Sequence, residues 1–133
     1  MIFVHTISTP ANTTQEDPQE TILDLGHGII HRVDVGFPPG ALGQAHVAID
    51  RDGRQLYPSN PQGNWAWDNL FQQFPDFFSL ESEPFAVTAR TWNDDTSFAH
   101  GITLQFLILP REILLPPRED TGIVARLGRV LNR

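Results

Sequence analysis

Five histidines are the side chains in this sequence best suited to hold a metal ion or to move a proton. A compact metal site on a β-barrel is typically marked by two histidines one residue apart followed by a glutamate, and this spacing is absent. His31 and His46 fall in neighbouring predicted strands, but their registers direct His31 toward the core and His46 away from it. We therefore predict isolated histidines with local hydrogen bonds, no metal site and no cofactor. The histidines are His5, His27, His31, His46 and His100.

Carboxylates and hydroxyls give no clearer catalytic pattern. Asp50 and Asp52 in "DRDG" resemble the start of a calcium loop, but the further oxygen ligands and the distal glutamate are missing, so a hairpin turn is predicted. The segment "NDD" at residues 93–95 is also interpreted as a turn. The sequence has no G-x-S-x-G motif, no P-loop and no cysteine. It therefore predicts a protein that is not an enzyme and has no catalytic residue.

The overall composition limits the classes of partner. The chain has 133 residues and a net charge of −7. That length suits one domain, and the negative charge argues against nucleic acid or an anionic membrane as the main partner. No stretch is apolar for long enough to cross a membrane, and the first residues lack the charged start of a signal peptide. We expect synthesis in the cytoplasm.

The elements that must position these residues are mostly short strands. Residues 28–37 alternate between apolar and polar types and form the clearest half-buried strand. Residues 58–82 are less regular, and there Phe71 and Phe74 fit one helical turn that Pro75 would end. The other predicted strands cover residues 1–8, 44–50, a short segment ending near Tyr57, 84–92 and 100–110.

Many short strands with little helix predict an all-β fold. We expect an antiparallel β-sandwich with either a jelly-roll or an immunoglobulin-like Greek-key topology. Residues 9–21 contain almost nothing apolar and are predicted to form an extended N-terminal loop or a mobile arm. The sandwich domain would cover residues 1–110. Residues 111–133 would form an extended tail that ends in a short amphipathic helix.

The segment "YPSNPQGNWAWDN" at residues 57–69 places three large aromatic side chains in a context typical of loops. Trp65 and Trp67 are two residues apart, so in an extended segment they point the same way. They could plug the protein's own core, anchor another subunit, or stack on a sugar ring. We expect core packing first for at least one of the two, a subunit contact next, and a sugar platform third. A carbohydrate-binding module using Trp65 and Trp67 is therefore the alternative function.

The strand predicted over residues 100–110 is apolar on both faces near its end. Leu107 and Leu109 face away from the predicted core side, and such a strand is covered twice, by a second sheet or by another subunit. The weak tail helix also needs a surface on which to dock. The interface candidates are Tyr57, Trp65, Trp67, Leu107, Leu109, Ile123, Leu127 and Leu131.

An arm at residues 9–21, a sandwich over 28–109 and a tail over 110–133 together resemble the small β-sandwich decoration, cement or minor capsid proteins of tailed bacteriophages. The resemblance implies a homo-oligomer, with a trimer favoured, that binds other structural subunits. It also implies a place in the virion. A metal-dependent enzyme on a cupin-like barrel, using His31, His46 and His100, is the third possibility.

Overall fold

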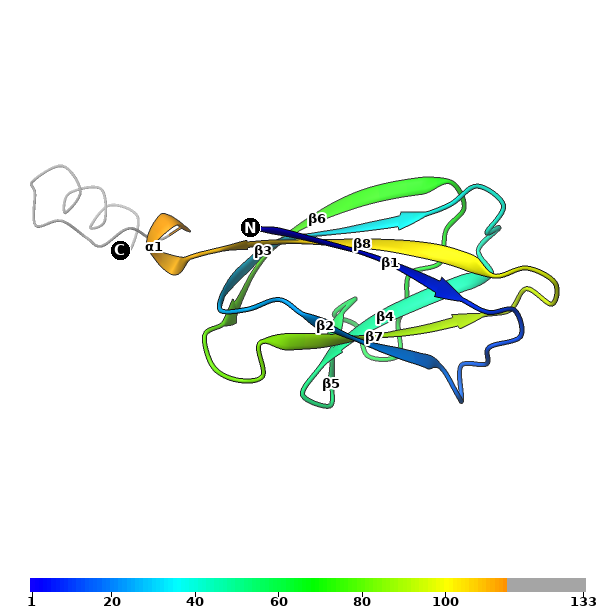
Figure 1. The fold of residues 1–133 in the computed structure, drawn as a ribbon, viewed down its shortest axis with the longest axis horizontal. Coiled ribbons are helices and arrows are strands. Elements are labelled where there is room, and N and C mark those ends of the chain that lie inside the picture. The colour runs from blue at the N-terminus through cyan, green and yellow to red at the C-terminus, as the bar shows by residue number, and fades with distance from the viewer. Residues whose placement is uncertain (115–133) are drawn as a thin grey trace, which may run out of the picture.

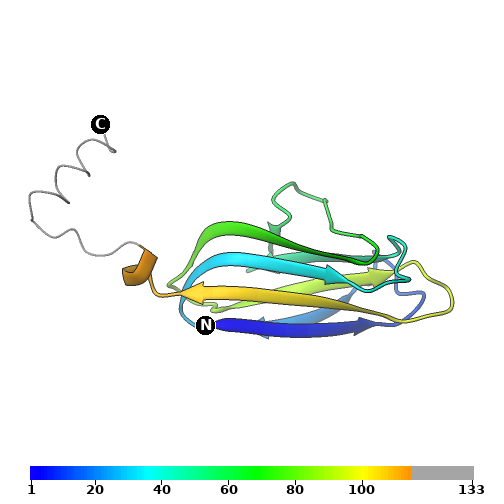
Figure 2. The same cartoon turned by 90° about the horizontal axis from the view of Figure 1, so that it is seen from above.

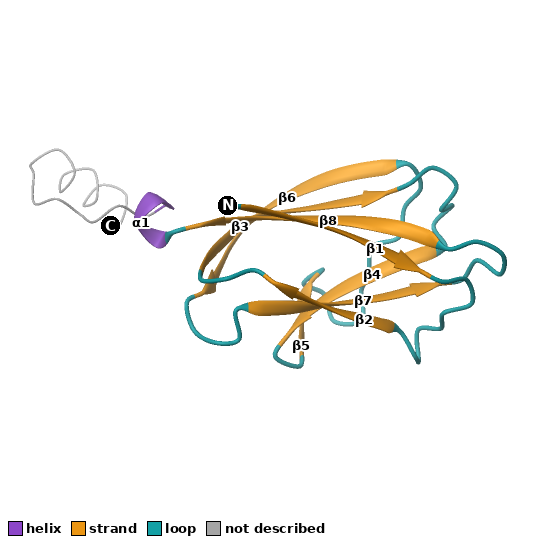
Figure 3. Ribbon diagram, in the orientation of Figure 1, coloured by secondary structure: helices purple, strands orange, loops and turns teal. Residues whose placement is uncertain are grey.

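The computed structural model describes residues 1–114, and strands make up nearly all of their regular structure (Figure 3). Each strand is bounded by turn residues such as proline, glycine, asparagine and aspartate. The elements are β1 (Ile2–Thr9), β2 (Gln19–Asp24), β3 (Gly28–Phe37), β4 (Ala45–Arg51), β5 (Arg54–Tyr57), β6 (Leu70–Leu80), β7 (Ala86–Asn93), β8 (His100–Leu109) and α1 (Arg111–Leu114).

The strands form two four-stranded sheets that face each other (Figure 1). One sheet has the order β1-β8-β3-β6 and the other has the order β2-β7-β4-β5. All pairings within the sheets are antiparallel. Figure 2 shows the first sheet with β1 along one edge and β6 along the other. The predicted all-β antiparallel sandwich is therefore confirmed.

The core lies between the sheets and follows the two-residue period of the strands. In β8 the inward residues are Ile102, Leu104, Phe106 and Ile108, all of which are buried, as the sequence pattern predicted. The inward residues of β3 include Ile30 and Val33, which belong to the same core. A bulge at His31 shifts the register of β3 between these two residues. Burial of these rows supplies the main stabilisation of the fold.

Two strands differ from the sequence prediction. Residues 70–80 form β6 rather than a helical turn, and Pro75 is accepted because β6 lies at the edge of its sheet. The second difference is β2, whose short polar pattern hides a single deeply buried residue, Leu23. The connection after β1 is consequently shorter than the predicted loop over residues 9–21. It is fixed to the sandwich where Asn93 N donates to Thr13 O at 2.9 Å.

The turn between β4 and β5 is the hairpin that the sequence predicted. Asp52 has a φ of 52° and Gly53 a φ of 79°. Two successive residues in the left-handed region are typical of the type I′ turn, whose twist matches that of the flanking strands. The carboxylates of "DRDG" therefore belong to a hairpin and not to a calcium loop.

The chain leaves the sandwich at the end of β8 through α1. The Arg111 guanidinium lies 2.8 Å from Glu81 and 5.8 Å from the centre of the Phe77 ring, so it holds α1 to the end of β6. Within residues 1–114 no helix has the length and apolar character needed to cross a membrane. The predicted tail helix, with Ile123, Leu127 and Leu131, lies outside the described residues.

A buried ion pair lies at the centre of the sheet β1-β8-β3-β6, on the side away from the core. Asp34 is only 1 % exposed, and Arg32 donates to its carboxylate from Nε at 2.8 Å and from Nη2 at 3.0 Å. On the neighbouring strands, Asp34 is flanked by Gln73 of β6 and Gln105 of β8. Asp34 is thus kept from water, and Arg32 is the partner that compensates its burial.

We expect Arg32→Ala to lower the free energy of unfolding by about 3 kcal/mol, because it leaves a buried charge without its partner. The double variant Arg32→Ala/Asp34→Ala should be more stable than the single one, since no unpaired charge remains. Arg54→Ala, at an exposed arginine of β5, is the control and should change stability by less than about 0.5 kcal/mol. Urea unfolding curves of the variants measure these differences. Equal losses in the single and double variants would contradict this account.

Candidate functional site

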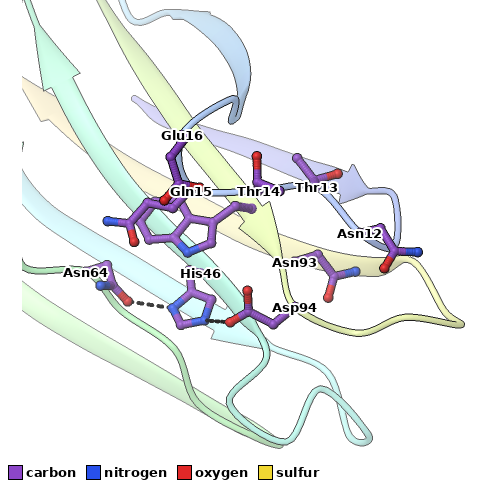
Figure 4. A pocket seen from close by; sticks show the side chains of 10 residues that line it. Asn12, Thr13, Thr14, Gln15, Glu16, His46, Asn64, Asn93 and Asp94 are labelled. Carbon is purple, nitrogen blue, oxygen red and sulfur yellow. Dashed lines mark hydrogen bonds and ion pairs between the residues drawn. The ribbon is translucent and has the colours of Figure 1, made fainter.

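A polar pocket of about 430 Å³ opens beside β4 and β7 on the outer side of the sheet β2-β7-β4-β5 (Figure 4). His46 lies at its centre, where Nδ1 is 2.7 Å from Asn64 Oδ1 and Nε2 is 2.8 Å from Asp94 Oδ2. As predicted, His46 points away from the core. The pocket is lined by Asn12, Thr13, Thr14, Gln15, Glu16, His46, Asn64, Trp92, Asn93 and Asp94.

The pocket is assembled by pairing between β4 and β7. His46 lies directly opposite Trp92 in the register, and their rings stack at 5.1 Å with an angle of 4° between the planes. The connection between β1 and β2 brings the side chains of residues 12–16 to the other wall. The threonine hydroxyls on that wall form hydrogen bonds within the connection itself, since Thr13 Oγ1 donates to Pro10 O and Thr14 Oγ1 accepts from Asp17 N. The arrangement can hydrogen-bond a polar ligand, but it holds no activated nucleophile.

A second histidine–aspartate pair fixes the loop between β7 and β8. His100 Nε2 lies 2.8 Å from Asp95 Oδ2, while Asp95 Oδ1 accepts from the backbone amides of Ser97 and Phe98. The pKa of the Asp95 carboxyl is lowered below its ordinary value, most by the hydrogen bond from the Ser97 amide and next by the hydrogen bond with His100. Each of these contacts favours the ionised carboxylate, so the loop is a pH-sensitive part of the fold.

The histidines do not come together as a metal site. Among the described residues there is no group of three or more histidine, cysteine, aspartate or glutamate side chains that could hold a metal ion. His46 and His100 each bond to a different aspartate, and His31 lies on the opposite sheet at the β3 bulge. The arrangement therefore gives no support to an enzyme that uses His31, His46 and His100.

The aromatic segment closes one open side of the sandwich. Trp65 stacks on Phe74 of β6 at 5.2 Å, and Trp67 meets Phe37 of β3 edge-on at 5.6 Å. Both tryptophans are partly buried and pack against the core. Trp65 also joins β4 through backbone bonds to Val47 at 2.9 and 3.0 Å. Packing against the core, which was predicted for at least one of the two tryptophans, is thus seen for both, although each ring remains partly exposed.

Tyr57 ties the two edge strands on this side together. Its hydroxyl donates to Asp76 of β6 from the end of β5. Burial, together with the Asp76 carboxylate, raises the pKa of the Tyr57 phenol far above its ordinary value. Tyr57 therefore lies in the core of the monomer, and its role as an interface candidate stays a prediction.

The outer side of the sheet β1-β8-β3-β6 carries a set of apolar side chains that we call the outer apolar face. Ile2 and Val4 of β1 are 58 % and 56 % exposed, and Phe71 and Phe77 of β6 are each 47 % exposed. Leu107 and Leu109 of β8 lie between these strands and are half-buried. The outer apolar face consists of Ile2, Val4, Phe71, Phe77, Leu107 and Leu109.

One end of this face is hollowed because two glycines lack side chains. A Cβ at Gly36 would approach the Phe71 ring to 2.8 Å, so only glycine lets that ring lie across β3. The hollow has a volume of about 370 Å³ and is also lined by Gly101 and Thr103. Sequence reasoning missed Phe71 and Phe77 as surface residues because it did not predict β6. In a strand, the odd-numbered Phe71 and Phe77 point to the face opposite that of the even-numbered Phe74 and Phe78. This alternation is the signal that could have revealed them.

We expect Trp65→Ala to lower the free energy of unfolding by about 2 kcal/mol, since it removes a half-buried ring from the core. Trp65→Phe retains an aromatic ring and should lose less. Thermal and urea unfolding of the purified variants measure the effect. A melting temperature unchanged by Trp65→Ala, combined with loss of sugar binding, would show instead that Trp65 is a ligand platform.

The loop between β7 and β8 predicts a dependence of stability on pH. Because the pKa of Asp95 is lower in the folded chain, its contribution is present above the unfolded value near 4 and is lost as the pH falls through the folded value. Asp95→Asn should therefore lose less stability than the wild type between pH 5 and about pH 2. Urea unfolding across that range tests this, and parallel losses in both proteins would contradict it.

No protein-family model matches the chain, and no curated protein matches it either. The conclusions about function that follow are drawn from the residues and surfaces described above.

Proposed function

We propose that this chain is a non-enzymatic structural protein that self-associates and binds other protein subunits, as a decoration or minor structural component of a virion. The observation that carries the proposal is the outer apolar face. Half-exposed aromatic and aliphatic side chains gathered on one side of a sheet are typical of a protein–protein interface. The resemblance to phage decoration proteins gives the proposal its biological setting and favours a trimer.

The distribution of charge supports this assignment. The strand positions that share the outer apolar face carry only two charged residues, Arg32 and Asp34, and these neutralise each other. On the opposite sheet, Arg90 and Asp50 pair across β7 and β4, while Glu20 lies beside Arg90 on β2. In a chain with a net charge of −7, the strand positions of this face are thus nearly free of charge, and the guanidinium of Arg111 beside Phe77 is paired with Glu81. Depletion of charge is typical of the buried centre of an interface.

We also propose the finer topology, a jelly roll. In the orders β1-β8-β3-β6 and β2-β7-β4-β5, the paired strands are β1 with β8, β2 with β7, β3 with β6 and β4 with β5. Each pair therefore lies, along the chain, between the two strands of the pair before it. The chain changes sheet at every connection except the β4–β5 hairpin. Two interleaved Greek keys of eight strands have this arrangement, which occurs in viral capsid proteins, lectins and cupins. The topology is compatible with the structural role but does not by itself select it.

Carbohydrate binding is the second candidate, and the pocket around His46 favours it. Its walls carry the amides of Asn12, Gln15 and Asn64, which can both donate and accept hydrogen bonds, as a sugar ring requires. Trp65 and Trp67, on which the carbohydrate alternative first relied, pack against the core and remain partly exposed. A glycan array with Asn64→Ala as the comparison would reveal such an activity.

The double variant Phe71→Asp/Phe77→Asp places two charges on the outer apolar face and should keep the chain out of assemblies with its partner subunits. Ile22→Asp is the matched control, because Ile22 is 72 % exposed on β2 of the opposite sheet. Tagged proteins expressed in the natural source would be separated by sedimentation. The wild type and the control should travel with large particles whose other subunits mass spectrometry identifies, and the double variant should remain light. Equal incorporation of all three proteins would contradict the proposal.

A further inference from the structure

Within residues 1–114, strand β1 presents a row of backbone groups without a partner along its outer edge. Met1 and Ile108 exchange both backbone hydrogen bonds, with the Met1 nitrogen donating to Ile108 O at 2.5 Å and Ile108 N donating to Met1 O at 2.7 Å. Since antiparallel pairing alternates along a strand, the odd-numbered residues of β1 bond to β8. The even-numbered residues Ile2, Val4 and Thr6 therefore direct their N–H and C=O groups away from the sheet.

The side chain of Gln19 supports this pattern and marks where the free edge ends. Its Nε2 donates to Ser8 O at 3.0 Å, so the outward carbonyl of Ser8 already has a partner. The open part of the edge is the segment from Ile2 to Thr6. Figure 2 shows β1 along the border of its sheet, with β8 on its inner side only.

This edge lacks the features by which soluble proteins usually block strand pairing. Residues 2–9 contain no lysine, arginine, aspartate, glutamate or proline. Their register with β8 runs without a bulge. A regular, uncharged edge strand with exposed apolar side chains is the kind that pairs with another strand.

The other edge strands carry such protection. At the opposite border of the same sheet, β6 has Pro75 and Asp76 at its centre. In the second sheet, β2 has six residues and includes Glu20 and Asp24, while β5 has only four residues. Among the described strands, β1 is therefore the edge open to pairing, and in a second copy its counterpart is the same strand.

We propose that two copies of this chain pair antiparallel through β1, with Val4 on the two-fold axis. This register matches the open segment, because it sets Val4 opposite Val4 and Ile2 opposite Thr6, with outward N–H and C=O groups on both strands. It joins two four-stranded sheets into one continuous sheet and extends the outer apolar face across the dimer. No charged side chains face each other. The inference rests on the self-association proposed above and assigns it to a strand edge.

A self-pairing edge gives a two-fold contact, which closes as a dimer. A trimer, as the resemblance to decoration proteins implies, would have to form through another surface, such as the outer apolar face. The two ideas are therefore separable by experiment, since Phe71 and Phe77 lie on β6, at the far border of the sheet from β1.

The first test compares two substitutions at Thr6. Both Thr6→Pro and Thr6→Val remove the side-chain contact between the hydroxyls of Thr6 and Thr103, but only proline removes the outward N–H. Light scattering and analytical ultracentrifugation should show a wild-type dimer, retained in Thr6→Val. In Thr6→Pro the dimer Kd should rise at least about tenfold. Circular dichroism and the melting temperature check that both variants remain folded.

The second test uses charge at the two-fold axis. Val4→Lys and Val4→Glu should each be monomeric, because like charges would meet in the Val4–Val4 pair. An equimolar mixture of the two variants should dimerise again. Hydrogen exchange followed by NMR should show the amides of Ile2, Val4 and Thr6 protected in the wild-type dimer and exchanging rapidly in either monomeric variant.

Three outcomes would overturn the inference. A wild-type monomer at high concentration excludes the dimer, and protected β1 amides in that monomer would mean that residues 115–133 of the same chain cover the edge. A trimer with freely exchanging β1 amides, dissolved by Phe71→Asp/Phe77→Asp, would leave the proposed function standing and reject the β1 contact. Failure of the mixed Val4 variants to associate, with each folded, would reject the Val4-centred register.

Discussion

The inward-facing side chains of the two sheets must fill the space between them, and the rest of the structure depends on this packing. Phe106 and its neighbours on β8 belong to one buried cluster with residues of the opposite sheet, as in other β-sandwiches. Because side chains alternate along each strand, the residues that fill the core also fix which residues face outward. A one-residue slip in any central strand would place polar side chains in the core, so each outer face is a consequence of the packing.

The two outer faces that result are chemically different. The face of β2-β7-β4-β5 carries the Arg90–Asp50 ion pair and the polar pocket around His46. The strands of the face of β1-β8-β3-β6 carry few charged side chains, and its central Asp34, which is 1 % exposed, accepts two hydrogen bonds from Arg32. This contrast within one small domain is the basis for proposing the apolar sheet, rather than the polar one, as the surface that contacts other subunits.

The two open sides of the sandwich are also treated differently. Between β5 and β6 the gap is closed by Trp65, Trp67 and the Tyr57–Asp76 hydrogen bond, and Pro75 makes the neighbouring edge unsuitable for pairing. Between β1 and β2 there is no comparable plug among the described residues, and β1 keeps free backbone groups. The large aromatic side chains in the loop before β6 are thus explained because they cover the core between β5 and β6, whereas the backbone edge at β1 remains open to pairing.

The sequence by itself determined the all-β class, the alternation of β8 and of the second half of β3, and the Asp52-Gly53 hairpin, because these follow from local periodicity and turn chemistry. It did not predict the bulge at His31, which turns Ile30 rather than Ile29 and His31 toward the core. It did not reveal β2 or β6, whose edge positions tolerate polar residues and a proline. Nor could it bring together Asn64, His46 and Asp94, or show that β1 has an unpaired border. Only the tertiary structure decided those features. Strand neighbours are set by long-range packing, so residues that meet across strands are separated by no characteristic number of residues in the sequence.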